Sequence, residues 1–84
     1  MRAIVNTAAQ IAEIIRGRRK ARGISQRALA SKLGISQSRL SAIEAGSSPL
    51  TVDRLIVLAN VLDLQLVVQD KVDKPSKPRS RAEW

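Results

Sequence analysis

The stretch QRALASKLGISQSRLSAIE, residues 26–44, decides the fold of this 84-residue chain. It divides at Gly34 into two apolar patterns of helical period, and each pattern is preceded by a serine, Ser25 or Ser36, that can cap a helix. Glycine suits the left-handed turn between two steeply crossing helices, and Ala30 is small where those helices approach each other. We therefore predict a helix-turn-helix with these core-facing side chains: Leu29, Leu33, Ile35, Leu40 and Ile43.

Similar patterns predict one helix on each side of this unit. Thr7 and Gln10 form a T-x-x-Q capping box that begins a first helix, and Gly23 is suited to end it. Thr51 can cap a last helix after the loop SSPL. We expect the buried face of that last helix to consist of Val52, Leu55, Ile56, Leu58, Ala59 and Leu62.

After the last helix the apolar period changes from helical to two. The alternation over residues 64–69 predicts a short strand, and no other segment of the sequence is predicted to be one. A lone strand has unpaired backbone groups, so we expect it to pair with the same strand of a second subunit. The expected fold class is therefore an all-α helix bundle with a short C-terminal strand in an intersubunit sheet. The expected dimerisation residues are Leu64, Leu66, Val67 and Val68.

The charge of the chain indicates a polyanionic partner. Fifteen Lys and Arg against seven Asp and Glu give a net charge of +8, crowded into residues 16–27 and 74–81. A run of like charges is usually a solvated face, but here the first run adjoins the predicted helix-turn-helix, which favours nucleic acid. We expect residues 1–70 to form one DNA-binding and dimerisation domain. Residues 71–84, rich in Pro, Ser and basic residues, are expected to be a flexible basic tail.

Several function classes are disfavoured by composition. The sequence has no Cys and no His, which removes thiolate and imidazole metal ligands and the Ser-His-Asp triad. Its acidic residues, such as Glu13, Asp53 and Asp70, are too scattered to suggest a catalytic pair. We expect no catalytic residue, no metal and no cofactor. No apolar run is long enough to span a membrane, and the expected location is cytoplasmic and nucleoid-associated.

The phrases GISQRALASKLGIS (residues 23–36) and IEAG (residues 43–46) resemble the Cro/repressor-type (XRE) helix-turn-helix family. The resemblance covers roughly residues 7–66. It implies a lambda-repressor-like bundle whose third helix lies in the major groove, and a homodimer on a palindromic double-stranded DNA operator.

The same resemblance implies roles for individual residues. Gln26 binds a phosphate and supports the recognition helix. The alternative is that it is a plain exposed residue at the start of a helix. Gln37 reads adenine through its amide. Arg39 either pairs with guanine or binds a phosphate, and the two roles are equally expected. Ala42 offers only a contact to a thymine methyl group. The full expected DNA-binding set is Gln26, Arg27, Ser36, Gln37, Ser38, Arg39, Ser41 and Ser47.

The resemblance bears on three further residues, two of which match the family pattern and one of which departs from it. In related repressors a Glu at position 44 pairs with an Arg at position 19, which implies a structural ion pair between Arg19 and Glu44. Arg18 occupies a site that is usually Leu and follows Gly17. Either the first helix is loosened there, or Arg18 lays its stem over the core with its head on DNA.

The second half of the chain narrows the resemblance. LTVDRLIVLANVLDLQLVVQD (residues 50–70), with a polar tail ending in EW, resembles HipB-type antitoxins. This implies repression of the chain's own operon and a HipA-like kinase toxin as partner, with Trp84 as the docking residue. A terminal Trp is by itself more often incidental. The alternative is a stand-alone or phage Cro-type repressor without a toxin.

Overall fold

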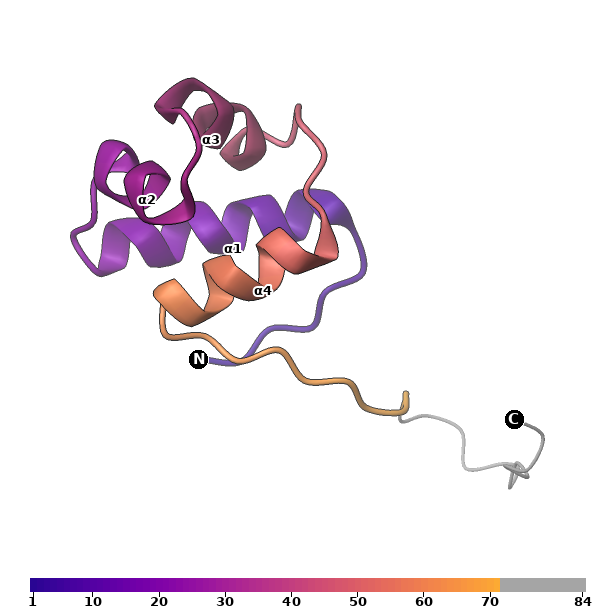
Figure 1. The fold of residues 1–84 in the computed structure, drawn as a ribbon. Helices are drawn as coiled ribbons and strands as arrows, with labels where there is room; N and C mark the ends of the chain where they lie inside the picture. Colours follow the sequence, from indigo (N-terminus) through magenta and orange to yellow (C-terminus); the bar gives the residue numbers. More distant parts are fainter. Residues whose placement is uncertain (72–84) are drawn as a thin grey trace.

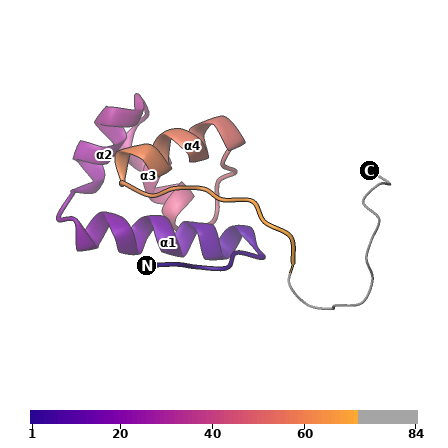
Figure 2. The same ribbon diagram turned by 90° about the horizontal axis from the view of Figure 1, so that it is seen from below.

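The computed structural model describes residues 1–71, which contain four α-helices and no strand (Figure 1). Figures 1 and 2 show α2 and α3 close together over one side of α1, with α4 beside them. None of these helices is long and apolar enough to cross a membrane. The predicted all-α helix-turn-helix bundle is confirmed. The helices are α1 (Ala8–Ala21), α2 (Gln26–Leu33), α3 (Gln37–Glu44) and α4 (Val52–Val61).

Every helix begins at the cap that the sequence predicts. In each case a Ser or Thr hydroxyl accepts a hydrogen bond from the backbone N–H three residues later, which satisfies a donor that the helix leaves free. At α1 the capping box is complete, because the Gln10 side chain accepts in return from the backbone N–H of Thr7 at 2.9 Å. The caps are Thr7, Ser25, Ser36 and Thr51.

Left-handed backbone conformations mark the ends of these helices. Gly34, with φ of +70°, makes the turn between α2 and α3, where a side chain would be strained. Gly23 and Gly46 also have positive φ, as expected after α1 and α3. After α4 the same conformation falls on Asp63, with φ of +62°, because Asp is among the few residues that tolerate it.

The core is aliphatic and lies where all four helices meet. Leu29, Leu40, Leu58 and Leu62 are completely buried. The predicted core residues Leu33 and Ile35 are partly buried and pack against this cluster, and Ala30 is buried between α2 and α3 as expected. At about 25 cal/mol per Å² of apolar surface, this tight cluster is the main source of stability for the bundle.

The buried face predicted for α4 is wrong at two positions. Val52 is 70% exposed and Ile56 is 45% exposed, and the neighbouring Val57 is 47% exposed. The helix turns only a narrow stripe towards the core, so the apolar residues beside that stripe remain on the surface. The stripe consists of Leu55, Leu58, Ala59 and Val61, and Leu62, directly after the helix, continues it.

The segment after α4 runs back along that helix (Figures 1 and 2). In this single chain residues 64–71 form neither helix nor strand. Leu64 is partly buried against the core, whereas Leu66, Val67 and Val68 are exposed. A sheet between subunits requires a second chain, so the predicted pairing stays a prediction. Trp84 and the tail from residue 72 lie outside the described residues.

Candidate nucleic-acid interface

The N-terminal turns of α3 form an exposed polar part of the helix-turn-helix. Leu40 and Ile43 bury one side of α3 in the core, which turns Gln37, Ser38 and Arg39 towards solvent. Ser41 is exposed one turn further along. Figure 1 places α3 on the side of the bundle opposite the segment that follows α4. The helix therefore presents its predicted base-reading residues without obstruction from the rest of the described chain.

The two predicted DNA-binding serines at the ends of α3 already have partners within the protein. The Ser36 hydroxyl accepts from the Arg39 backbone N–H at 3.0 Å, and the Ser47 hydroxyl donates to the Ala42 carbonyl at 3.2 Å. In the Ser36 cap the hydroxyl oxygen accepts and its hydrogen is not used, whereas Ser47 has its hydroxyl hydrogen engaged. Arg27 is exposed in the first turn of α2.

Gln26 and Gln37 meet where the beginnings of α2 and α3 approach each other. The Gln37 Nε2 donates to the Gln26 Oε1 at 3.5 Å, which is the long limit of a hydrogen bond. Gln26 is half-buried and Gln37 is exposed. The structure thus brings together the residue expected to brace the recognition helix and the residue expected to read a base.

Arg19 and Glu44 form the predicted ion pair, and both are buried, with exposed fractions of 8% and 3%. The Arg19 guanidinium donates from Nε to Oε2 at 2.7 Å and from Nη2 to Oε1 at 2.9 Å. Its remaining terminal nitrogen, Nη1, donates to the Ile24 carbonyl at 3.0 Å. This two-pronged geometry is the strong form of an Arg–carboxylate contact. It ties the C-terminal end of α3 to α1.

The surroundings of Glu44 shift its acidity. Burial alone would raise the pKa of this carboxyl, but hydrogen bonds from Arg19 and Gln26, with the attraction of Arg19 and Arg16, outweigh burial. The pKa of Glu44 is therefore lower than its ordinary value. The hydrogen bond to Glu44 raises the pKa of Arg19 against the opposing effect of its own burial. The pair stays ionised at neutral pH.

One contact of this site is not predicted by the sequence. The Gln26 Nε2 donates to the Glu44 Oε1 at 3.1 Å, so Gln26 joins the buried ion pair as well as Gln37. The helical spacing of residues places Gln26 at the start of α2 but does not reveal which way its amide turns. Only the packing of α2 against α3 brings this amide to the carboxylate.

Arg18 has a structural partner in place of the DNA contact considered above. α1 is continuous through Gly17, and the half-buried Arg18 donates from Nε to the Leu62 carbonyl at 3.1 Å. Leu62 is the residue that ends α4, so a cation sits at the negative end of that helix dipole. Beside it, Arg22 forms an exposed ion pair with Asp63 at 3.4 Å. Arg18 of α1 and Arg22, which directly follows that helix, therefore both contact the turn after α4.

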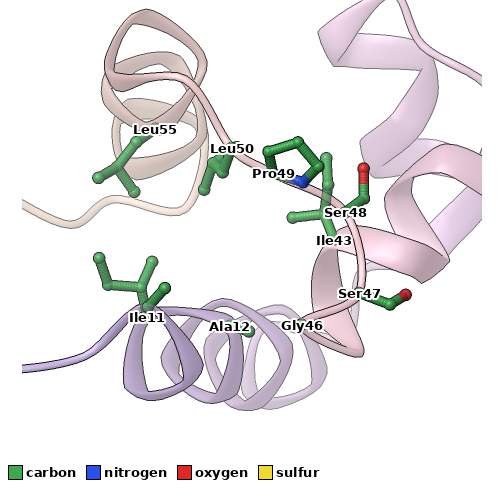
Figure 3. A pocket seen from close by; sticks show the side chains of 10 residues that line it. Ile11, Ala12, Ile43, Gly46, Ser47, Ser48, Pro49, Leu50 and Leu55 are labelled. Carbon is green, nitrogen blue, oxygen red and sulfur yellow. The ribbon is translucent and has the colours of Figure 1, made fainter.

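A pocket of about 230 Å³ lies beside α3, between the first turns of α1, the loop of residues 46–50 and α4. Figure 3 shows Ile11 and Leu55 facing each other across it. Its lining is mainly apolar, and Ser47 and Ser48 supply the hydroxyl groups. No charged side chain lines this pocket, which distinguishes it from the polar surface at the beginnings of α2 and α3. Residues 1–71 contain no group of three or more acidic or metal-binding side chains suited to a metal ion.

The helix-turn-helix family matches residues 15–68 of the chain. A curated relative is the uncharacterized HTH-type transcriptional regulator y4dL of Sinorhizobium fredii (strain NBRC 101917 / NGR234), 35% identical over 66 residues. This match covers 79% of the chain and spans about a third (34%) of the relative's own length.

Two kinds of solved structure are similar to the bundle. The wild-type restriction-modification controller protein C.Esp1396I has a TM-score of 0.64 and 26% identity, over 69% of this chain and 76% of that one. The HipB–O1–O2 complex has a TM-score of 0.72 and 25% identity, over 82% of this chain and 100% of that one. A chain of the HipA–HipB–O2–O3 complex has a TM-score of 0.74 over 84% and 100%, and at 24% identity it shows the fold alone. With the geometry of α2 and α3, these matches show that the chain belongs to the helix-turn-helix family of DNA-binding regulators, of the Cro/repressor (XRE) type.

Proposed function

We propose that the chain is a sequence-specific transcriptional repressor that inserts α3 into the major groove of operator DNA. The observation that carries this proposal is the start of α3, where Gln37 and Arg39 are exposed and Gln26 of α2 contacts both Gln37 and Glu44 of α3. Amide and guanidinium groups are the side chains that read adenine and guanine in the major groove. The net charge of +8 supports attraction to the phosphate backbone.

We further propose that the repressor is a homodimer. Apolar side chains are exposed on α4, at Val52, Ile56 and Val57, and on the segment that follows it. Grouped apolar surface of this kind is typical of an interface with another protein. Pairing through Leu64, Leu66, Val67 and Val68 of each chain would cover the apolar side chains of that segment. Two subunits then place their α3 helices in successive major grooves, about 34 Å apart, on a palindromic operator.

The finer proposal is an antitoxin that represses its own operon and holds a HipA-like kinase toxin. The similarity to HipB over more than four fifths of this chain supports it, because one of the similar structures is the HipA–HipB–O2–O3 complex. Residues 1–70 form the DNA-binding and dimerisation domain in this proposal. Residues 71–84, ending at Trp84, extend from it towards the toxin.

A second candidate is a regulator without a toxin, such as a stand-alone or phage Cro-type repressor or a restriction-modification controller. The similarity to C.Esp1396I supports the controller, since its identity of 26% is about the same as the 25% of the HipB–O1–O2 structure. Co-purification of the full chain with the product of a neighbouring kinase-like gene separates the two candidates. A stable complex supports the antitoxin, and its absence with both proteins folded supports the toxin-free regulator.

Selection of bound duplexes from a random DNA library tests the DNA-binding proposal itself. We expect enrichment of a palindrome with half-sites one helical turn apart. The variant Gln37→Met should lower discrimination at one base pair in each half-site, by ~1–3 kcal/mol of binding free energy. Enrichment of no sequence at all, with the protein folded, would contradict the proposal.

A further inference from the structure

We propose that Glu44 is a positioning residue for base reading, acting through Gln26 on the amide of Gln37. This inference rests on the proposed reading of a base by Gln37. It assigns to the buried ion pair a role beyond joining α1 to α3. The connection begins at residues that are almost wholly buried, Arg19 and Glu44, and ends at the exposed Gln37.

The Glu44 carboxylate determines the direction of the Gln26 amide. The Glu44 carboxylate has no hydrogen to donate, so it can only accept. Arg19 holds both of its oxygens, at 2.7 and 2.9 Å, which keeps the carboxylate in one orientation. Gln26 lies 3.1 Å from Oε1 and must therefore turn its Nε2 towards Glu44. The Oε1 of Gln26 is left on the other side of the amide.

The Gln26 amide in turn orients the amide of Gln37. The Gln26 Oε1 can only accept, so Gln37 must turn its own Nε2 towards it, and the observed contact is 3.5 Å. Because this contact is long, it biases the Gln37 amide and does not lock it in the free protein. A base that fits the biased orientation gains from the contact, while a base that needs the opposite orientation must break it.

The consequence is a fixed order of donor and acceptor at the start of α3. Gln37 keeps one N–H of its Nε2 and its Oε1 for the DNA. Adenine presents an acceptor, N7, beside a donor, N6–H₂, in the major groove, whereas guanine presents two acceptors. A free amide can turn over and exchange its donor and acceptor. The amide held by Gln26 therefore favours adenine in one placement and disfavours arrangements that need the reversed order.

The test is the base preference of Gln26→Met, which keeps the length of the side chain and removes both hydrogen bonds. Its binding to operators carrying each of the four bases at each half-site position is compared with that of Gln37→Met. We expect Gln26→Met to reduce discrimination at the position that Gln37→Met identifies, by a large part of the ~5- to 150-fold that a good bidentate contact supplies. Arg27→Met is the control, since this exposed neighbour should affect all operators equally and lower the salt dependence.

A second variant changes Glu44, where the series of hydrogen bonds begins. Glu44→Gln can donate as well as accept, so it lets the Gln26 amide turn over. In preparations that urea unfolding shows to be folded, we expect the same selective loss at the same base pair. If Glu44→Gln does not fold, Gln26→Met still tests the inference, because an unselective loss in that variant excludes any effect of Glu44 on Gln37 through Gln26.

The outcomes distinguish this inference from the proposed function. If Gln37→Met is selective but Gln26→Met weakens all operators equally, Gln26 is only a phosphate contact and the positioning role of Glu44 is wrong. If Gln37→Met leaves the base preference unchanged, Gln37 does not read a base, and the proposed reading fails together with this inference.

Discussion

Arg19 of α1 and Glu44 of α3 are joined by two hydrogen bonds, of 2.7 and 2.9 Å, with the side chains only 10% and 2% exposed. Their removal one at a time leaves a buried charge without its partner. We expect Arg19→Met or Glu44→Met alone to lower the free energy of unfolding by about 3–5 kcal/mol. The double variant should lose less than the sum of the two. Urea unfolding of all four proteins at one concentration measures this, and zero coupling would refute the buried pair.

The exposed ion pair between Arg22 and Asp63 provides a comparison. Its side chains are 40% and 78% exposed and its distance is 3.4 Å. Solvent screening limits such a pair to at most about 1 kcal/mol. The same cycle with Arg22→Met and Asp63→Asn, where Asn also tolerates the positive φ, should therefore give a much smaller coupling.

The lowered pKa of Glu44 predicts how stability depends on pH. In the unfolded chain a Glu takes up its proton at a pH of about 4.3, above the pH at which the folded protein does so. This contribution is therefore fully present above the unfolded pKa and is lost as the pH falls through the lower, folded one. We expect the free energy of unfolding to fall more steeply with decreasing pH in the wild-type chain than in Glu44→Gln. Parallel curves would show that Glu44 does not contribute.

Arg18 should matter for stability and not for DNA. Its Nε donates to the Leu62 carbonyl at the end of α4. Arg18→Met keeps the apolar stem, so the loss should be about 0.5–1.5 kcal/mol of unfolding free energy, from one hydrogen bond. Operator affinity at a given salt concentration should be unchanged apart from the general effect of one charge, for which Lys20→Met is the matched control. A loss well beyond that of Lys20→Met would place Arg18 on the DNA after all.

The proposed dimer depends on the segment after α4. Val67→Pro removes a backbone donor and distorts a strand, whereas Val67→Thr keeps the backbone free to pair. In sedimentation experiments we expect more monomer for Val67→Pro, with weaker operator binding, and little change for Val67→Thr. A tight dimer in Val67→Pro would exclude this segment as the interface and leave the exposed side chains of α4 as the remaining candidate.

The antitoxin proposal makes a prediction at the other end of the chain. If the tail holds a HipA-like kinase, Trp84 supplies its single large apolar group, and affinity should concentrate there. We expect Trp84→Ala to lower affinity for the purified kinase in calorimetry while operator binding without the kinase stays the same. Glu83→Ala is the neighbouring control. Equal kinase affinity for the wild type and Trp84→Ala would remove the anchor role.

The helices could be predicted from the sequence because their determinants are local. The hydroxyl of Ser36 caps α3 with atoms three residues away, and Gly34 adopts its positive φ within a single turn. The ion pair of Arg19 and Glu44 joins residues 25 apart, and it was predicted only through the family resemblance. The spacing of these two residues along the chain does not by itself predict that they are in contact.

Contacts that depend on packing could not be predicted in this way. Arg18 reaches Leu62 across 44 residues because the fold brings the end of α4 to α1, and nothing near Arg18 in the sequence indicates that partner. The amide of Gln26 turns inwards because α3 brings Glu44 to it. Val52 and Ile56 follow an apolar pattern that suits burial, yet no described part of this chain covers them. A covering partner is a property of an assembly, and a single sequence does not encode it locally.

The aliphatic core has a practical consequence for spectroscopy. The sequence has no Phe and no Tyr, and its one Trp stands at position 84, outside the packed helices described here. Unfolding of the bundle therefore gives no intrinsic fluorescence signal from its own core, while circular dichroism follows the helices directly. Indole emission instead reports on the last residue alone. The two optical signals of one unlabelled sample thus come from different parts of the sequence.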